Sequence, residues 1–278
     1  MIAKENNAAN KMLEEIVQDR HYKNCLMSPQ DAMVEADNRS TLIVVDTNRP
    51  DQLEDQNLLE SIHRVCVIDH HRRAAEYISP VVVNLHEPYA SSASELVTEL
   101  LQYAVDKKEI LPIEAKSLMA GMVLDTKSFN VRTGERTFEA AAYLRQLGVD
   151  TVDVKMLLRT DYNETMKKFD IMSAAIPHDK HKDIVIAALD YAVSRPLAAQ
   201  AADELLNIEG ISASFVLFTD KEQVFISARS IGTANVQMIL EPLGGGGNTA
   251  TAGAQVKGAT VSQVVNRLCA SIDKFYEK

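Results

Sequence analysis

Short apolar runs of strand length alternate with longer segments of helical periodicity along the first half of the chain. The runs at 41–46, 65–69 and 81–85 are rich in Val and Ile and are typical of buried strands. Apolar residues recur at helical spacing over four segments, which are 91–105, 115–125, 135–147 and 152–158. Strands that alternate with helices predict an α/β fold, with a mostly parallel sheet flanked by helices.

A second α/β pattern begins after the polar stretch at 178–183. Two apolar runs on either side of a tight turn at 220–222 predict a β-hairpin. The other elements predicted in this half are a connecting helix at 161–175, a strand at 184–189, a helix at 196–207, a short helix from Asn235 and a final helix at 261–276. We therefore expect a first domain at 1–160, a linker helix at 161–182 and a smaller mixed α/β domain at 183–278.

The composition narrows the class of protein. With 278 residues, 46% of them hydrophobic, the chain is long enough for two domains with separate cores. It has no run of about 20 apolar residues, so we expect no membrane span, and residues 1–15 show helical spacing rather than a secretory signal. A net charge of −10 and the absence of Trp argue against a duplex-DNA binder and a single-strand stacking platform. Three cysteines without metal-like or disulfide-like spacing indicate a cytoplasmic location.

Two predicted strands end in an aspartate. Asp46 follows the first apolar run and Asp69 closes the second. In open α/β sheets, ligands bind at the carboxyl ends of the strands, where neighbouring parallel strands would bring these two carboxylates together. Carboxylates so placed repel one another, and a cation or a shared proton would relieve that repulsion.

The sequence Asp69-His70-His71 strengthens the case for a metal. An aspartate followed by two imidazoles offers oxygen and nitrogen ligands suited to Mn²⁺, Fe²⁺ or Zn²⁺ rather than Ca²⁺. Asp125 ends a predicted helix, where its charge opposes the helix dipole and favours a compensating cation. A polar strand terminus and a solvated helix end remain the alternative interpretations of these residues.

The four glycines at 244–247 have two possible meanings. Such a run is most often a flexible linker, but glycines also let backbone N–H groups converge on an anion. Arg229 and Ser230 at a strand end, together with Asn248 after the glycines, would suit a phosphate. Both interpretations stay open on these residues alone.

The five remaining histidines have no partner at ligand spacing, which indicates surface or packing roles for His21, His63, His86, His178 and His181.

Four motifs together are more specific than any one of them. They are Asp46-Thr47-Asn48-Arg49-Pro50, Ile68-Asp69-His70-His71-Arg72-Arg73, Glu87-Pro88-Tyr89-Ala90-Ser91-Ser92 and Val123-Leu124-Asp125-Thr126. The combination resembles the DHH phosphoesterase superfamily in its branch with a DHH-associated second domain. Within that branch it looks most like the catalytic region of the GdpP-type cyclic-di-AMP phosphodiesterases of Gram-positive bacteria. The resemblance covers residues 26–278.

The resemblance implies roles for individual residues. In the family, two Mn²⁺ ions generate a hydroxide that attacks a phosphodiester phosphorus. Asp46, His70 and Asp125 would be metal ligands, and Asp69 would support His70. His71 and Arg72 would lie toward the phosphate. The residues expected to bind substrate in the second domain are Arg229, Ser230, Gly245, Gly246, Gly247 and Asn248.

The chain departs from the family pattern at two places. The opening strand of the family, with its His-x-x-x-Asp-x-Asp motif, does not occur, so one Mn²⁺ rather than two is possible here. Asn248 stands where the glycine loop of the family presents a histidine, and an amide cannot carry a proton at neutral pH. Both departures lower the expected activity.

Three functions are therefore weighed. The first is a metal-dependent phosphodiesterase that hydrolyses cyclic di-AMP to linear pApA. The second is a catalytically impaired module that still binds cyclic di-AMP or another small dinucleotide. The third is a nanoRNase or phosphatase that acts on short linear nucleotides. The resemblance also implies a homodimer, and a parent protein in which such a region is the cytoplasmic end of a membrane-anchored sensor.

Overall fold

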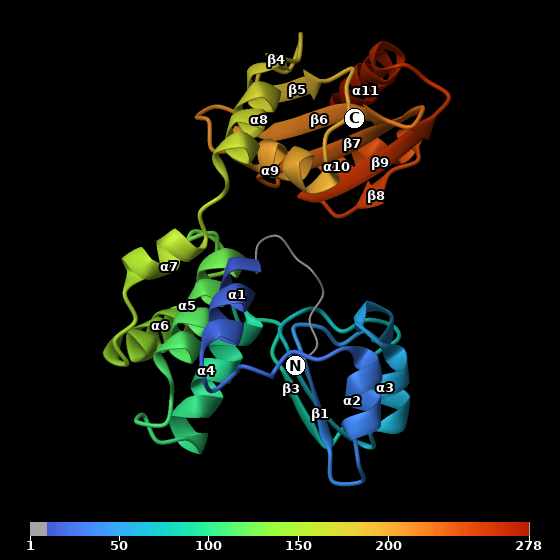
Figure 1. Cartoon of the computed structure of the whole chain (residues 1–278). Coiled ribbons are helices and arrows are strands. Elements are labelled where there is room, and N and C mark those ends of the chain that lie inside the picture. The colour runs from blue at the N-terminus through green and yellow to red at the C-terminus, as the bar shows by residue number, and fades with distance from the viewer. Residues whose placement is uncertain (1–9, 278) are drawn as a thin grey trace. The chain divides into compact units, whose positions relative to one another are not determined.

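The chain folds into two units, and each has its own sheet. A computed structural model describes residues 10–277 (Figure 1). The expected helical pattern at 1–15 lies partly outside the described residues. The first unit comprises Met1–Arg159 and the second Thr160–Lys278. The predicted α/β class is confirmed in both units.

The first unit contains a parallel sheet of three strands. They are β1 (Thr41–Val45), β2 (Arg64–Asp69) and β3 (Val83–His86), in the order β1-β2-β3. Each strand lies within two residues of its predicted position. The carboxyl ends of β1 and β2 therefore meet at one edge of the sheet, which brings Asp46 next to Asp69.

The sheet of the first unit is thinly covered. Its core holds four buried apolar side chains, which are Val44, Val65, Val67 and Ile78. Among residues 10–277, only β2 pairs with β1, and on β1 the side chain of Ile43 is 60% exposed. The outer edge of β1 is thus open in the part of the chain that the structure describes.

The helices of the first unit fall into two groups. In Figure 1, two short helices, α2 (Pro29–Glu35) and α3 (Gln56–Ser61), lie along one side of the sheet, and the other helices gather on its other side. That second group has a larger core, built around Met119, Met122 and Leu144. Its members are α1 (Asn10–Gln18), α4 (Ala93–Ala104), α5 (Pro112–Asp125), α6 (Glu135–Gln146) and α7 (Thr151–Leu157).

The second unit is built on a mixed sheet of six strands in the order β4-β5-β6-β7-β9-β8. The strands are β4 (Ala175–Pro177), β5 (Ile184–Ala188), β6 (Ala213–Asp220), β7 (Gln223–Ser230), β8 (Gly246–Gly247) and β9 (Thr251–Lys257). Strands β6 and β7 form the predicted hairpin. Apolar side chains are buried on both faces of this sheet, which is therefore much better packed than the sheet of the first unit.

Helices cover both faces of the second sheet. Side chains from α10 (Val236–Leu240) and α11 (Val261–Tyr276) pack on one face, and those of α9 (Arg195–Leu205) pack on the other. The helix expected as a linker is α8 (Tyr162–Ser173). Its Ile171 is buried in the same core as α9, so α8 is part of the second unit.

Candidate metal centre

The first aspartate leaves β1 in an unusual backbone conformation. Asp46 has a φ of 65°, in the left-handed region that aspartate tolerates better than most residues. Its backbone N–H donates to the carbonyl of Ile68 at 2.9 Å and so extends the pairing with β2 by one residue. The carboxylate stands at the end of the sheet with 56% of its side chain exposed.

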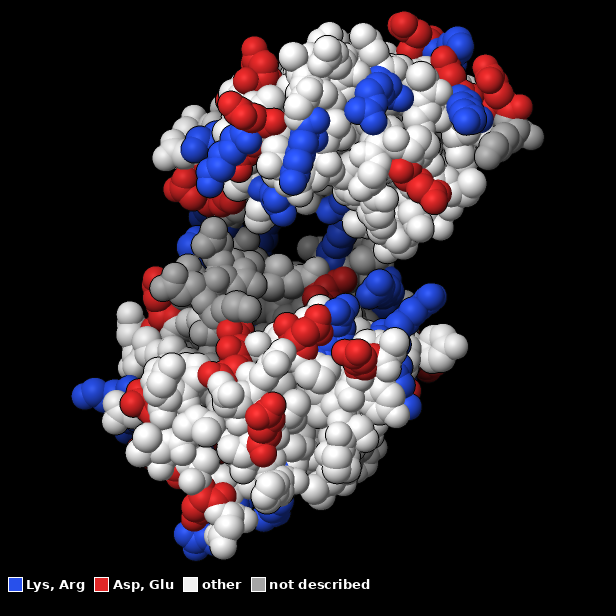
Figure 2. Space-filling model, turned by 90° about the vertical axis from the view of Figure 1, so that its right-hand side faces the viewer, with Lys and Arg blue, Asp and Glu red and all other residues white. Residues whose placement is uncertain are grey.

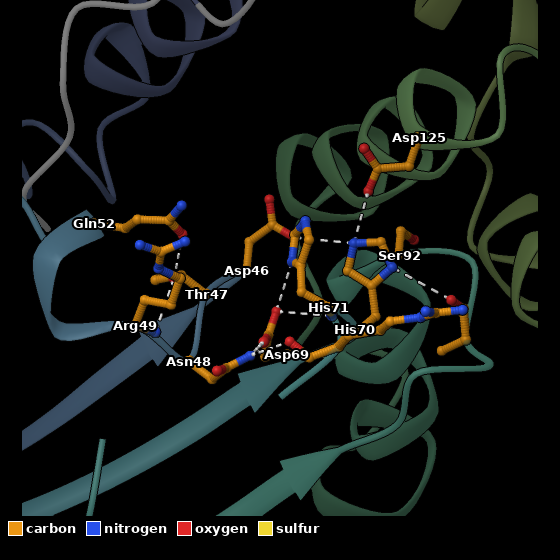
Figure 3. Close-up of polar contacts among 12 residues, drawn as sticks. Asp46, Thr47, Asn48, Arg49, Gln52, Asp69, His70, His71, Ser92 and Asp125 are labelled. Atoms are coloured by element: carbon orange, nitrogen blue, oxygen red, sulfur yellow. Dashed lines mark hydrogen bonds and ion pairs between the residues drawn. The ribbon is translucent and has the colours of Figure 1, made fainter. Parts of the chain in front are cut away.

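His70 is buried beside it and points one ring nitrogen into the site (Figure 3). Its Nδ1 lies 3.3 Å from the carbonyl oxygen of Ala90, and a carbonyl only accepts, so Nδ1 is the nitrogen that carries the proton. Its Nε2 lies 3.3 Å from Oδ1 of Asp46 and 3.7 Å from Oδ2 of Asp125. A backbone carbonyl behind the ring is the arrangement that orients metal-binding histidines.

Asp125 comes to this place as the last residue of α5. The chain then turns through three consecutive residues with left-handed φ angles, 46° at Lys127, 60° at Ser128 and 64° at Phe129. The buried hydroxyl of Thr126 holds this turn, because it donates to Met122 O and accepts from the N–H of Phe129. Strained non-glycine backbone of this kind is concentrated at functional sites.

Asp69 supports a different histidine from the one expected. Its buried carboxylate accepts from the backbone N–H of His71 at 3.2 Å and lies 2.8 Å from Nδ1 of the same residue. The expectation that Asp69 supports His70 is therefore wrong. The reason is the strand periodicity, because residues two apart point to the same side of the chain and adjacent residues do not.

The site holds two carboxylates and one imidazole in close proximity, and their pKa values respond to it. The hydrogen bond to Asp46 raises the pKa of His70, against the opposing effect of burial. Burial raises the pKa of Asp125, and the charge of Asp46 adds to that effect. Burial would also raise the pKa of Asp69, but the hydrogen bonds from Asn48 and His71 outweigh it, so that pKa is lowered. His70 and Asp125 thus hold a proton more tightly than free side chains do.

The donor set suits a divalent transition metal. Bonds of about 2.0–2.1 Å to one ion place neighbouring ligand atoms about 3–3.4 Å apart. The separations of 3.3 and 3.7 Å from His70 Nε2 come close to that spacing. Two carboxylate oxygens and one imidazole nitrogen match Mn²⁺, Fe²⁺ or Zn²⁺. The residues whose ligand atoms all lie within 4.8 Å of one another are Asp46, His70 and His71, and Asp125 approaches this group at His70. Nδ1 of His71 lies 3.9 Å from Asp46 but is already engaged by Asp69.

Sequence reasoning missed Asn48 as a positioning residue. Its buried amide donates through Nδ2 to Asp69, and its Oδ1 accepts from the backbone N–H of Ala74 at 3.1 Å. Asn48 thereby fixes the carboxylate that holds His71. The available signal was its place two residues after the aspartate that ends β1.

A buried carboxylate fixes the loop that carries Ala90. Glu95 on α4 accepts from the N–H and the hydroxyl of Ser91, at 3.2 and 2.6 Å, and from the hydroxyl of Thr137 at 2.6 Å. Ser91, the residue after Ala90, is therefore anchored at two points, and Thr137 in turn holds the Glu95 carboxylate. This anchoring also fixes the carbonyl behind His70. Sequence reasoning missed Glu95, although its spacing of four residues from Ser91 before a helix was visible.

The predicted substrate residues of the second unit are held in different ways. Arg229 lies on the same face of β7 as Ser227 and Phe225, with its Nε at 3.3 Å from Oδ2 of Asp203. Ser230 is buried, and its hydroxyl accepts from the N–H groups of Gly232 and Ala234. The Arg229 side chain is thus only 16% exposed, and its Nη1 also donates to Ala228 O at 3.0 Å. The Ser230 hydroxyl serves a turn.

The glycine run forms a hairpin rather than a flexible linker. Gly246 and Gly247 make up β8 and pair with β9. A side chain at Gly245 or Gly247 would come within 3.0 Å of neighbouring backbone atoms, so both positions require glycine. Asn248 closes the hairpin, because its Oδ1 accepts from the N–H groups of Ala250 and Thr251. The close approach of β8 and β9 therefore accounts for these glycines without an anion, and substrate binding there stays a prediction.

A hollow of about 430 Å³ lies beside this hairpin on the α9 face of the second sheet. Its lining includes Ser227 from β7 and Gln255 from β9. The guanidinium of Arg195 lies 4.4 Å above the ring of Phe225 at its wall. A cation over an aromatic ring next to polar strand residues is a suitable surface for a small polar ligand.

Comparison with known families agrees with this geometry. Residues 2–122 match the model of the DHH family, N-terminal domain, and residues 181–278 match the model of the DHHA1 domain. The chain therefore belongs to the DHH family and carries a DHHA1 domain, which confirms the resemblance inferred from the motifs.

Three of the curated relatives are named cyclic-di-AMP phosphodiesterases. The chain is 41% identical over 270 residues to the cyclic-di-AMP phosphodiesterase PdeA of Listeria monocytogenes, covering 96% of this chain and 41% of that protein. It is 39% identical over 276 residues to the cyclic-di-AMP phosphodiesterase GdpP of Bacillus subtilis, covering 98% of this chain and 42% of that protein. The chain thus spans about two fifths of the length of these relatives.

The solved structures support the fold. An exopolyphosphatase-related protein from Bacteroides fragilis superimposes with a TM-score of 0.73 at 18% identity, over 89% of this chain and 75% of that one. RecJ of Thermus thermophilus in complex with Mn²⁺ gives a TM-score of 0.50 at 15% identity, over 96% of this chain and 50% of that one. Between residues 10 and 277, no helix has the length and apolar character needed to cross a membrane.

Proposed function

We propose that the chain is the hydrolytic part of a phosphodiesterase that opens cyclic di-AMP to linear pApA. One observation carries this proposal. Asp46, His70 and Asp125 converge at the carboxyl ends of the sheet, in a chain 39–41% identical over nearly its whole length to named cyclic-di-AMP phosphodiesterases.

Asp46, His70 through Nε2, and Asp125 would hold one Mn²⁺ ion. When bound, the ion lowers the pKa of a coordinated water and offsets negative charge on the phosphate. Burial of His70 and the carbonyl of Ala90 behind its ring keep the Nε2 lone pair aimed at this position. The partly exposed carboxylates on either side leave the centre open to a ligand from solvent.

His71, supported by Asp69, is proposed to act on the leaving group. The Asp69 carboxylate engages Nδ1 of His71, so Nε2 is the nitrogen that faces the substrate. Attack on phosphorus breaks the bond to the leaving sugar oxygen, and that oxygen needs a proton. A histidine whose far nitrogen is fixed by a carboxylate can deliver that proton from its near nitrogen. The exposed Arg72, next in sequence, would contact the phosphate oxygens.

The second unit is proposed to bind the substrate through Arg229 and the neighbouring hollow. The guanidinium offers charge-assisted hydrogen bonds to a phosphate, and the hollow has the size of a small-ligand site. The glycine hairpin and Asn248 border the same region of the sheet. A homodimer remains a prediction from the resemblance.

The charge distribution favours a small phosphorylated ligand over duplex DNA. In Figure 2, Lys and Arg side chains are scattered among Asp and Glu on the visible face, and the described residues on that face form no continuous basic surface. A duplex-DNA binder would need such a surface, whereas a dinucleotide needs only a few local cations.

The test is hydrolysis of cyclic di-AMP by the full chain after chelation and desalting, with and without added Mn²⁺. Chromatography separates pApA from AMP, and linear pApA is supplied in a parallel reaction. We expect Mn²⁺-dependent pApA as the main product. Faster conversion of linear pApA to AMP than of the cyclic substrate would instead favour the nanoRNase alternative. No product under either condition would contradict the proposal.

A second candidate is a module that binds the dinucleotide without hydrolysing it. The side chain of Asn248 favours this candidate, because its oxygen is committed to the hairpin and its amide cannot transfer a proton. Calorimetric titration with intact cyclic di-AMP separates the two. Binding without turnover in the presence of Mn²⁺ would establish the second candidate.

A further inference from the structure

A second cluster of metal-binding side chains lies wholly within the second unit. His178 and His181 belong to the segment between β4 and β5, and Asp273 lies on α11. The prediction that the two histidines have no partner at ligand spacing is wrong. Packing of α11 against the sheet brings a carboxylate from the far end of the sequence to both rings.

Three potential ligand atoms face one another without bonding. Oδ1 of Asp273 lies 3.9 Å from Nε2 of His178 and 3.8 Å from Nε2 of His181. Both distances are too long for a hydrogen bond. All three atoms lie within 4.8 Å of one another. A metal ion bonded to all three atoms would account for this spacing better than direct bonds among them would.

The carboxylate oxygen at the centre of the cluster makes no hydrogen bond to the described residues. Oδ1 of Asp273 is buried and accepts no hydrogen bond from the residues that the structure describes. Its other oxygen is different, because Nζ of Lys180 holds Oδ2 at 2.7 Å. A buried carboxylate oxygen without a hydrogen bond is costly. This oxygen is directed at two imidazoles, and a bound cation would stabilise that arrangement.

The surrounding structure fixes both rings. The segment is closed by two backbone hydrogen bonds, from the N–H of His178 to Ile184 O at 2.7 Å and from the N–H of Ile184 to His181 O at 3.0 Å. The His181 ring stacks between His178, at a centroid distance of 5.4 Å, and Tyr276, at 4.2 Å. Pre-organised ligands of this kind lose little freedom when an ion binds.

We propose that His178, His181 and Asp273 bind one Zn²⁺ ion that joins the β4–β5 segment to α11. Two imidazole nitrogens and one carboxylate oxygen form a typical three-residue zinc set, with the fourth position left to water. The spacing of three residues between the histidines and a third ligand from a distant helix suit such a site. Mg²⁺ and Ca²⁺ are disfavoured because both prefer oxygen ligands.

Binding has one cost in the cluster itself. The backbone N–H of His181 donates to Nδ1 of His178 at 3.3 Å, so the proton of the neutral ring sits on Nε2. When zinc binds Nε2, that proton moves to Nδ1, and the hydrogen bond from the N–H of His181 is lost. This hydrogen bond is long and therefore weak. Lys180 stays on Oδ2. Burial raises the pKa of the Cys269 thiol, one turn earlier on α11, and the charge of Asp273 adds to that effect.

The test uses the full chain in a His70→Gln background, so that the cluster in the first unit does not bind zinc. After chelation and desalting, calorimetric titration with Zn²⁺ should give one ion per chain. Adding His181→Gln or Asp273→Asn should weaken Zn²⁺ binding at least about tenfold. Zinc should raise the melting temperature of the background protein by about 5 °C or more, and should not raise that of either added variant.

Two control variants make the test specific. His63→Gln removes an exposed histidine of the first unit and should leave the zinc stoichiometry unchanged. Lys180→Met removes the ion pair but keeps all three ligands, so zinc should still bind. The proposal is overturned if the background protein binds no Zn²⁺, or if His181→Gln and Asp273→Asn bind it as tightly as the background does.

Discussion

The two units carry similar sets of ligands in different surroundings. In the first, Asp46 and Asp125 are 56% and 38% exposed on either side of a buried histidine. In the second, the His178 side chain is only 3% exposed, and the Asp273 side chain is 25% exposed. The first set stands at a sheet edge that is open to ligands, whereas the second joins the β4–β5 segment, in which His178 is the buried residue, to a helix.

The sheets that carry the two clusters also differ in packing: the sheet of the more exposed cluster is the less well packed. Among the described residues, the first cluster lies on three strands with four buried apolar side chains, and the outer edge of β1 is open. The second rests on six strands with apolar cores on both faces. A site that must admit substrate needs exposed carboxylates and local mobility, and a site that joins elements needs neither. Access rather than ligand type therefore separates a proposed catalytic centre from a proposed structural one.

The largest expected effect comes from removing the central ligand of the first cluster. His70→Gln should lower Mn²⁺-dependent hydrolysis of cyclic di-AMP by more than about 100-fold. Mutation of a residue that only contacts a metal ligand already lowers affinity or activity about 10–100-fold. Glutamine can still hydrogen-bond the carbonyl of Ala90, so the fold should survive, which circular dichroism would verify. His63→Gln is the matched control. Turnover that persists in His70→Gln would remove the first cluster from the reaction.

A smaller effect on turnover is expected from Asn48, which contacts Asp69 rather than a proposed metal ligand. Asn48→Ala removes the donor that fixes Asp69 and should lower turnover by about 10–100-fold. Mn²⁺ affinity should change much less, because Asn48 touches none of the three proposed ligands. Kinetics and Mn²⁺ titration on the same preparation separate the two effects. Equal losses of affinity and turnover would show that Asn48 supports the metal site itself rather than His71.

The pH dependence of Mn²⁺ binding should follow His70. Its pKa is raised in the metal-free protein, so the proton is held more tightly than by a free histidine. Mn²⁺ must displace that proton, so affinity should fall about tenfold per unit as the pH drops below the raised pKa. In the metal-free protein, the stability of the folded state depends on pH in the opposite direction. The raised pKa stabilises the folded state at low pH, and this contribution is lost as the pH rises through it.

Titrations with Mn²⁺ across neutral and mildly acidic pH test this directly. The decline should begin above the usual histidine pKa of about 6.5. Thermal unfolding of the metal-free chain over the same range provides the second arm. An affinity that stays constant through this range would mean that His70 does not exchange a proton for the metal.

Local chemistry explains which elements the sequence predicts well. The final helix was expected at 261–276 and is α11 with the same bounds, because Thr260 and Gln263 form a capping box at its start. Strand β9 was not predicted, since its small residues, such as Ala252 and Gly253, have weak strand propensity. Its pairing with β7 and β8 supplies what the local sequence lacks.

The same distinction applies to the two sites. The Asp46, His70 and Asp125 cluster was predictable, because strand ends and a helix end carry its members in recognisable motifs. The support of His71 by Asp69 depends on how the chain leaves β2. The second cluster was missed because its carboxylate comes from α11, and only tertiary packing places that helix beside His178.

The smallest predicted effect tests whether ring stacking prepares the second cluster. Tyr276 lies over His181 at a centroid distance of 4.2 Å, with 24° between the ring planes. Tyr276→Leu should weaken Zn²⁺ binding about threefold to tenfold, because an aromatic pair contributes about 0.5–1.5 kcal/mol. Tyr276→Phe keeps the ring and should bind Zn²⁺ as the unmodified residue does. Calorimetry on both variants in the His70→Gln background measures the difference. Equal weakening by Leu and Phe would assign the effect to the tyrosine hydroxyl, and no weakening by either would show that the β4–β5 segment alone orients His181.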